Sequence, residues 1–471
     1  MYEDHDALAR LDKDHVWHPY TQMAEYSATD PLVVVEGEGR KLKDAKGRWY
    51  YDGTSSIWLN VHGHRVPAID DAIIEQLGKV AHSTLLGQAN EPSILLAREL
   101  VEITPERLNK VFYSDSGSEA VEAAIKMALQ YWANLEGKET KRHRILSFED
   151  GYHGDTLGAV AAAPVETFHW PFKAMLPSAL RAPFPNPYRS EEPTPQGAVR
   201  ASLEAVERLF EEHPGEVVAV IVEAMMQGVA GIVVAPEGFL HGLSELCKKH
   251  DVLLIADEVA TGFGRTGRMF ACEHEDVTPD LMAVGKGLTA GYLPLAATLT
   301  TDEVYEAFLG SHAEKKTFFH GHSYTGNQLG CAAALGNLKL MRETKLIESL
   351  AEKERLISAR VEAMREHPYV GDVRYKGMVL GIELVADKET KTTYPWEAQA
   401  GWRVCNRARE KGLLVRPLGS VVICMPPLGS TLEELSEMLD ILAEALWEAT
   451  EKISILSEKV LSGAYRAGSP A

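Results

Sequence analysis

Two residues of this 471-residue chain have types and positions suited to chemistry on a small molecule. Asp257 follows the apolar run 252–256, and Lys286 follows a second such run, 281–284, inside a Gly-Lys-Gly sequence. Short apolar runs rich in branched residues are typical of buried parallel strands. Because the carboxyl ends of parallel strands meet at one crevice of an open α/β sheet, we expect both side chains to face the same site.

An amine and a carboxylate placed in this way can act on a heterocycle that carries an aldehyde. A lysine forms a Schiff base with a carbonyl compound, and a buried carboxylate keeps a nearby ring nitrogen protonated. Either residue alone is better explained as a solvated lysine or a structural acid, since surface lysines are the commonest kind. The pair favours a pyridoxal 5'-phosphate site, with Lys286 on the aldehyde and Asp257 at the pyridine nitrogen.

Three glycines between these residues, Gly262, Gly264 and Gly267, match the G-x-G-x-x-G pattern of dinucleotide-binding folds. In that motif the glycines follow the strand directly and open a helix. Here five residues, 257–261, precede Gly262, and no sustained helical periodicity follows. The pattern therefore argues against a nicotinamide site and predicts a tight loop at the edge of the pyridoxal cofactor.

A second signal lies at the start of a predicted helix, after a predicted strand at 111–113. Ser116, Gly117 and Ser118 stand at its amino end, where free backbone N–H groups and the helix dipole favour an anion. A simple N-cap is the common alternative, and both roles can hold at once. We assign this turn to the phosphate of the cofactor.

Further candidates lie in loops. Tyr152 can lie flat on a pyridine ring, and Asp155 can orient His153 or a neighbouring loop. Trp58 with Tyr20 can wall a pocket, although an isolated tryptophan is as often plain core.

His62 and His64 have the alternate spacing of a metal pair. Since no third ligand has suitable spacing, we expect no metal.

Composition limits the partners and the compartment. A net charge of -20 argues against nucleic acid and anionic membrane as partners, so we expect small-molecule substrates. The acidic, polar start is unlike a signal peptide, and no apolar run is long enough to span a bilayer. The five cysteines are far apart and form no C-x-x-C, which argues against a disulfide framework and against zinc. These features fit a cytoplasmic enzyme.

Strands that alternate with helices through the middle of the chain predict an α/β fold with a mostly parallel sheet covered on both faces. Alternating polarity predicts an antiparallel hairpin or meander at 32–52. Prolines predict a long surface loop at 164–198, and the small, polar stretch from about 457 predicts a fraying tail. We expect the N-terminal part of a smaller α+β domain at 1–66, a large cofactor-binding domain at 67–335, and the C-terminal part of the smaller domain at 336–471.

The order of WHPYTQM, DSGSEA, GYHGDT, DEVATGFGRTG, GKGLTAGYLP, HGHSYTGN and VRPLG resembles the class III pyridoxal-phosphate aminotransferases over nearly the whole chain. WHPYTQM and GYHGDT narrow the resemblance to the branch that aminates 8-amino-7-oxononanoate to 7,8-diaminononanoate in biotin biosynthesis. It implies a homodimer of fold-type I architecture, a seven-stranded-type sheet and ping-pong transamination through pyridoxamine phosphate. Another class III activity, on an omega-amino acid or ornithine, is the alternative.

Position by position, the resemblance also implies residue roles. Lys286, Asp257 and Tyr20 would be catalytic. The cofactor would contact Gly117, Ser118, Tyr152, Asp257, Val259, Lys286 and, from the second subunit, Ser323. The substrate would contact Tyr20, Trp58, Tyr152, Lys286, Gly321 and Arg416.

Arg416 also has a physical argument of its own. It interrupts the apolar strand LLVRPLGSVVICMPP, where a guanidinium is costly unless it meets an anion. Its fork geometry suits a substrate carboxylate. An edge-strand arginine in water is the plain alternative.

The amino donor is where the chain departs from the pattern. Many members that use S-adenosyl-L-methionine have two adjacent tryptophans in place of Ile57 and Trp58. They also tend to have a tyrosine near the position of Ile423, and Pro-Thr in place of His322 and Ser323. Because less aromatic surface weakens the case for an adenosyl group, these departures favour L-lysine as donor and leave S-adenosyl-L-methionine open.

Overall fold

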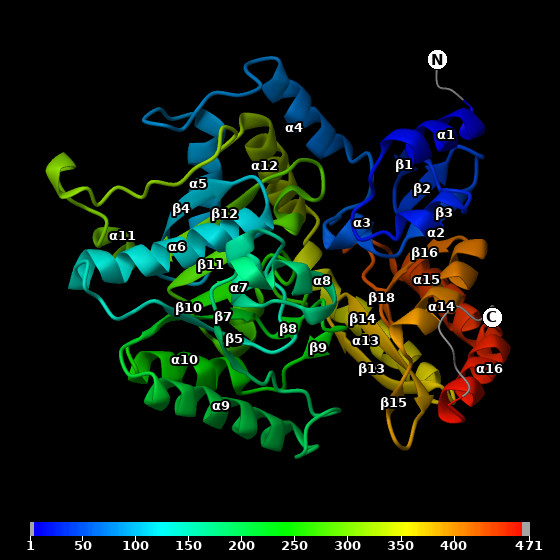
Figure 1. Cartoon of the computed structure of the whole chain (residues 1–471). Coiled ribbons are helices and arrows are strands. Elements are labelled where there is room, and N and C mark those ends of the chain that lie inside the picture. The colour runs from blue at the N-terminus through cyan, green and yellow to red at the C-terminus, as the bar shows by residue number, and fades with distance from the viewer. Residues whose placement is uncertain (1–3, 464–471) are drawn as a thin grey trace.

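The computed structural model describes residues 4–463, and its centre is a seven-stranded sheet (Figure 1). One strand pairs antiparallel with both of its neighbours, and the other pairings are parallel. The predicted α/β fold with a mostly parallel sheet is therefore confirmed. In spatial order the strands are β4 (Leu108–Ser114), the antiparallel β12 (Ala296–Thr301), β11 (Leu281–Val284), β10 (Leu253–Asp257), β7 (Val217–Glu223), β5 (Arg144–Phe148) and β6 (Leu180–Ala182).

Helices cover both faces of this sheet, because the central strands direct apolar side chains to each face in turn. Leu253 and Ile255 of β10 belong to the cluster formed with helix α6 (Gly117–Glu136). Leu254 belongs to the cluster formed with α10 (Phe239–Lys249) on the other face. This double burial explains the continuous apolar runs of the sequence. Further helices against the sheet are α5 (Glu91–Ile103), α9 (Pro195–Glu212) and α11 (Asp302–Glu306).

The long helix α12 (Gln328–Glu343) connects the sheet edge with helices outside it. It packs against α4 (Pro67–Leu77), α5 and the short turn η3 (Lys286–Thr289) that follows β11. Helix α4 has a proline in its first turn, where proline is tolerated.

The two ends of the chain meet in a second, four-stranded sheet. The meander predicted at 32–52 is present, and a strand from far along the chain adds to it in parallel. A separate sheet is built from later residues alone. The predicted domain limits at 66/67 and 335/336 stay predictions. The strands are β1 (Val34–Glu38), β2 (Lys41–Asp44), β3 (Trp49–Asp52) and β16 (Leu413–Leu414), then β13 (Val370–Lys376), β14 (Val379–Asp387), β15 (Thr392–Thr393), β17 (Arg416–Leu418) and β18 (Val421–Cys424).

The long loop predicted at 164–198 was wrong in part. The segment contains α8 (Glu166–His169), the 3-10 turn η1 (Trp170–Met175), the edge strand β6 and the start of α9. Its prolines misled the prediction, because two of them occupy the first turns of η1 and α9, where the missing N–H is harmless. A three-residue strand is also too short to leave a pattern.

The fraying predicted from about 457 was wrong for the residues that the structure describes. Helix α16 (Thr450–Leu461) continues to Leu461, and Ser457 is buried with its hydroxyl bonded to Tyr394. The rest of the predicted tail, 464–471, lies outside the described residues. Between 4 and 463 no helix combines the length and apolarity needed to cross a membrane. The remaining elements are α1 (His5–His15), α2 (Met23–Ser27), α3 (Ser55–Trp58), α7 (Leu157–Ala162), β8 (Met226–Gln227), β9 (Val233–Val234), η2 (Ala271–Glu275), η4 (His312–Glu314), α13 (Leu346–Arg365), η5 (Trp396–Ala398), α14 (Ala400–Glu410) and α15 (Leu432–Glu448).

Candidate active site

The carboxyl edge of the seven-stranded sheet brings Asp257 and Lys286 together. Strands β10 and β11 are parallel, and their register sets Asp257 beside Ala283. Lys286 follows three residues later, in the first position of η3. The two side chains are close enough for the Asp257 charge to act on the amine.

Asp257 is almost fully buried, and both of its carboxylate oxygens accept hydrogen bonds. One accepts from the backbone N–H of Val259 at 3.0 Å, and the other lies 2.7 Å from Nδ1 of His153. Of the two partners that the sequence offered for Asp155, the neighbouring loop is the one observed, since Tyr20 donates to Asp155 whereas His153 bonds to Asp257.

Lys286 has a strained backbone and a desolvated amine. Its φ is 42°, in the left-handed region, and its Nζ lies 5.2 Å from the centroid of the Trp58 ring. Burial lowers the pKa of Lys286, and the negative charges of Asp257 and Glu223 oppose that shift only in part. A larger fraction of the amine is therefore neutral near pH 7 than in a surface lysine.

Glu223, at the end of β7, is a component that the sequence did not predict. It is buried, and it accepts the backbone N–H of Tyr152 at 2.9 Å and that of Gly228 at 2.8 Å. Burial raises the pKa of Glu223 to about 7. Its signal in the sequence was a lone acid at the end of an apolar run, which is the position that Asp257 occupies one strand away.

The amino end of α6 closes another side of the site. A Cβ on Gly117 would overlap the side chain of Val259, so only glycine allows this approach. The hydroxyl of Ser118 accepts the backbone N–H of Thr156 at 3.0 Å. Ser116 and Glu119 form a capping box, so the predicted N-cap is confirmed.

Tyr20, Tyr152 and Asp155 form a hydroxyl network over the site. The Tyr20 hydroxyl donates to Asp155 at 2.6 Å and lies 3.3 Å from the Tyr152 hydroxyl. Burial, with the Asp155 bond, raises the pKa of Tyr20 to about 12. The nearby positive charge of Arg416 acts in the opposite direction. Within 4–463 the Arg416 guanidinium forms no ion pair, so it has charge free for an anion.

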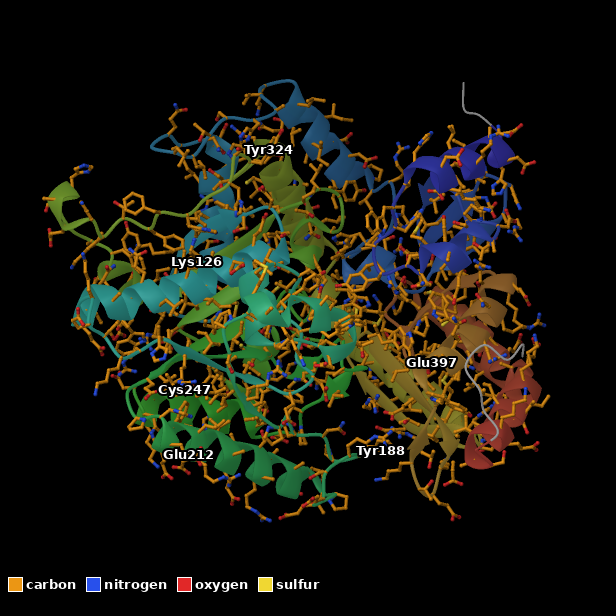
Figure 2. All side chains as sticks on the ribbon, in the orientation of Figure 1. Lys126, Tyr188, Glu212, Cys247, Tyr324 and Glu397 are labelled. Atoms are coloured by element: carbon orange, nitrogen blue, oxygen red, sulfur yellow. The ribbon has the colours of Figure 1, made fainter. Side chains whose placement is uncertain are left out.

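Gly321 and Ser323 are not joined to the sheet edge within this chain. They lie on the segment between α11 and α12, which extends beyond the neighbouring helices at the left of Figure 1. Ser323 is exposed and accepts a hydrogen bond from His82 through its carbonyl at 2.7 Å. Open space surrounds the Cα of Gly321. Lys126 on α6 steadies the segment through His320 at 2.9 Å, and Figure 2 labels Lys126 and the exposed Tyr324.

His62 and His64 hydrogen-bond to different partners. His62 bonds to Asn337 at 2.9 Å, and His64 bonds to Asp52 at 3.1 Å. Each ring is therefore used by the fold.

In the described part of the chain one group offers three metal-type ligands, Asp115, Glu119 and His322, whose ligand atoms lie within 4.8 Å of one another. Glu119 already accepts backbone N–H bonds in the capping box of α6. The absence of a metal stays a prediction.

The site and the fold lead to a family. Residues 22–446 match the family model "Aminotransferase class-III". The chain belongs to the class III aminotransferases, and it is a pyridoxal-phosphate-dependent transaminase of fold-type I architecture.

Individual relatives narrow the similarity. The chain is 52% identical over 440 residues to a protein from Anoxybacillus flavithermus named adenosylmethionine-8-amino-7-oxononanoate aminotransferase, covering 93% of this chain and 96% of that one. A protein of the same name from Geobacter sulfurreducens is 48% identical over 449 residues, covering 95% and 99%. The crystal structure of the enzyme of that name from Methanocaldococcus jannaschii is 47% identical, with a TM-score of 0.89 over 94% of this chain and 99% of that one.

Proposed function

We propose that the protein transfers an amino group to 8-amino-7-oxononanoate and so forms 7,8-diaminononanoate for biotin biosynthesis. The observation that carries the proposal is the arrangement of Asp257 and Lys286, whose pKa is lowered by burial, after adjacent parallel strands. Relatives that are 47–52% identical are named for the same acceptor, which supports it.

The residues present fit pyridoxal 5'-phosphate. We assign Asp257 to the ring nitrogen, Tyr152 and Val259 to the two ring faces, and Gly117 with Ser118 to the phosphate. The fit rests on a buried acid, a desolvated amine and a helix amino end that only glycine can bring against Val259. When bound, the cofactor supplies an electron-withdrawing ring that stabilises negative charge on the carbon that loses its proton.

Lys286 is the group that we assign to proton transfer. Its lowered pKa increases the fraction of neutral amine, the form that can accept a proton from the amino-bearing carbon of the donor. The same amine returns a proton when the acceptor occupies the site. Trp58, whose ring faces the amine, excludes water from this space.

Arg416, Tyr20 and Trp58 are assigned to the substrates. Arg416 is free to hold a carboxylate in both half-reactions, because no side chain from 4–463 pairs with it. The Tyr20 hydroxyl bonds to Asp155 and feels the charge of Arg416, so we assign it to a polar group of the substrate. Trp58 gives the methylene chain an apolar wall.

A homodimer is the assembly that we propose. The segment that carries Gly321 and Ser323 projects from the body, and its Phe319 is 77% exposed. A second copy would cover this apolar surface and bring its Ser323 to the phosphate and its Gly321 to the substrate.

The donor is one of two amines. The relatives are named for adenosylmethionine, which favours S-adenosyl-L-methionine. Ile57 in place of an aromatic residue favours L-lysine. To decide, holoenzyme is mixed with each amine separately while the visible absorbance of the bound cofactor is followed. The amine that bleaches it is the donor.

Replacing the central amine gives the sharpest test of the function. Lys286→Ala should lower kcat by about 10⁴-fold or more, measured as 7,8-diaminononanoate formed from 8-amino-7-oxononanoate. Lys353→Met is the matched control, since Lys353 is also buried but bonds to the carbonyl of Leu428 and should keep activity. Full activity of Lys286→Ala would refute the proposal. Amination of pyruvate or 2-oxoglutarate but not of oxononanoate would favour the omega-amino acid or ornithine alternative.

A further inference from the structure

The turn that carries Lys286 needs support from outside itself. Lys286 has a φ of 42° and is the first residue of the 3-10 turn η3, which is followed by Ala290 at a φ of 53°. Residues with side chains rarely adopt this left-handed backbone, and they persist there only where the surrounding structure fixes them. The carbonyls of such a turn are the natural points at which to hold it.

Asn337 of α12 supplies that support. Its side chain is fully buried, and its Nδ2 donates to the carbonyls of Gly287 and Leu288, at 2.9 Å each. These are the two residues directly after Lys286. One amide therefore ties η3 to α12 through both of its N–H bonds.

His62 fixes the orientation of that amide. Its Nε2 lies 2.9 Å from Oδ1 of Asn337, and because that oxygen can only accept, Nε2 carries the proton and donates. Burial lowers the pKa of His62 to about 4, and the positive charges of Arg40 and Lys353 act in the same direction. The ring is therefore neutral at pH 7, in the tautomer that this bond requires.

We propose that His62 and Asn337 are positioning residues for Lys286, acting as a relay from the N-terminal segment through α12 to η3. If the Asn337 amide were flipped, its oxygen would face the carbonyl oxygens of Gly287 and Leu288. The N–H that His62 donates to Oδ1 therefore selects the orientation in which the amide holds the turn. The relay gives His62 a role in the site, although neither residue faces the sheet edge. The inference rests on the assignment of Lys286 as the reactive amine.

Loosening the turn would expose the amine to water. Desolvation is the largest influence that lowers the pKa of Lys286, and Arg265 adds to it, whereas Asp257 and Glu223 oppose it. A turn that relaxes admits water and weakens the desolvation, so the pKa of the amine rises toward its ordinary value. The pH at which the neutral amine of Lys286 becomes available therefore reports how firmly the turn is held.

The test follows the rate at which apoenzyme takes up pyridoxal phosphate, measured by visible absorbance across pH. Asn337→Leu and His62→Leu should move the midpoint of that profile upward by about half a unit or more, and lower kcat about five- to tenfold. His62→Gln, which keeps an N–H donor, should restore the wild-type midpoint. Asn337→Ser is the milder variant if Asn337→Leu does not fold, and it should shift the midpoint in the same direction.

Ser202→Ala is the matched control for the loss of a buried hydrogen bond. Ser202 lies on the outer helix α9, and its hydroxyl donates to the carbonyl of Pro183 at 2.6 Å. This control should lower thermal stability without moving the midpoint. Folded variants at His62 and Asn337 that keep the wild-type midpoint, or an equal shift in Ser202→Ala, would overturn the relay. Wild-type protein that takes up no pyridoxal phosphate would instead refute the proposed function.

Discussion

The site is built from two regions that differ in how they hold their residues. The sheet edge presents Asp257 at the end of the regular strand β10, which pairs in parallel with β11, the strand that leads into the turn of Lys286. The opposite wall presents Trp58 from α3, in which four consecutive residues have positive φ: Ser55 (48°), Ser56 (46°), Ile57 (73°) and Trp58 (70°). Each L-residue in such a left-handed turn costs about 1–2 kcal/mol.

Contacts from elsewhere in the chain offset that cost. Asp52 accepts the N–H of Ser56 at 2.8 Å and its hydroxyl at 2.7 Å, and it also meets His64. Ser55 donates to the carbonyl of Met425 at 2.7 Å. The difference teaches that the strands of the sheet edge follow from local pattern, whereas the Trp58 turn, like the turn of Lys286, depends on tertiary contacts.

The largest effect is expected from removing the negative charge of Asp257 at the sheet edge. Asp257→Asn keeps an oxygen for the Val259 N–H but removes the negative charge, so kcat should fall about 10²–10³-fold. Steady-state kinetics on folded, cofactor-loaded protein measures it. The control is Asp280→Asn, since Asp280 accepts the N–H of Leu254 near the opposite end of the same strands and should change kcat little. Equal losses in both variants would show that general destabilisation explains the effect.

Two carboxyl groups should give the two regions opposite pH dependence. Burial raises the pKa of Glu258, behind the sheet edge, from 4.5 to about 7. Its contribution to stability is therefore complete below pH 4.5 and is lost as pH rises through 7. Between pH 4.5 and 7 the free energy of unfolding of Glu258→Gln should rise by about 3 kcal/mol relative to that of the wild type, measured by urea unfolding.

Asp52, beneath the Trp58 turn, should behave in the reverse sense. Burial acts to raise its pKa, but bonds from His64 and Ser56 outweigh burial and lower it. Its stabilising effect is present above pH 3.8 and is lost as pH falls through the lowered value. Asp52→Asn should therefore lose stability relative to wild type at neutral pH and approach it in acid. If the stability of Glu258→Gln and that of Asp52→Asn, each relative to wild type, changed with pH in the same direction, the predicted difference between the two regions would be contradicted.

A smaller effect is expected at Arg416, the residue that we assign to the substrate carboxylate. Arg416→Lys keeps the charge but loses the fork, so KM for 8-amino-7-oxononanoate should rise about tenfold with a smaller change in kcat. An acceptor analogue with an amide in place of the carboxylate is the control and should not distinguish the two enzymes. A loss confined to kcat would argue against a carboxylate clamp.

The smallest effect concerns strain in the turn itself. Ile57 is a β-branched residue at a φ of 73°, so Ile57→Gly should raise the free energy of unfolding by about 1 kcal/mol. Ile74 is a matched exposed isoleucine in the regular helix α4, and Ile74→Gly should lower the free energy of unfolding by about 1 kcal/mol. Urea unfolding gives both values. If both variants lose stability equally, the turn stores no strain at Ile57.

Sequence pattern was sufficient for the sheet edge. Strands were predicted at 281–284 and 252–256 because buried parallel strands are continuous apolar runs, and the structure has them at Leu281–Val284 and Leu253–Asp257. The helix after Ser116 was predicted from its cap and periodicity. The glycines at 262–267 form the tight loop expected, with Gly264 and Gly267 at positive φ.

Partners distant in sequence could not be predicted. The glycine loop was placed at the cofactor's edge, yet Gly264 faces Ile347 and Leu428 from the C-terminal third of the chain. Similarly, nothing near His62 in the sequence points to Asn337, which lies 275 positions away. Propensity and periodicity report on neighbours within a few residues, so they carry no information on such pairs.

The parallel pairing of β3 with β16 has a consequence for synthesis on the ribosome. A nascent chain that has emerged only as far as residue 412 can already build the seven-stranded sheet, but it lacks both β16 and the carbonyl that receives Ser55. The wall that carries Trp58 therefore closes only after residue 425 is free. Fragments that stop earlier leave β3 without β16 and the Ser55 hydroxyl without its acceptor, so this wall is completed late in translation.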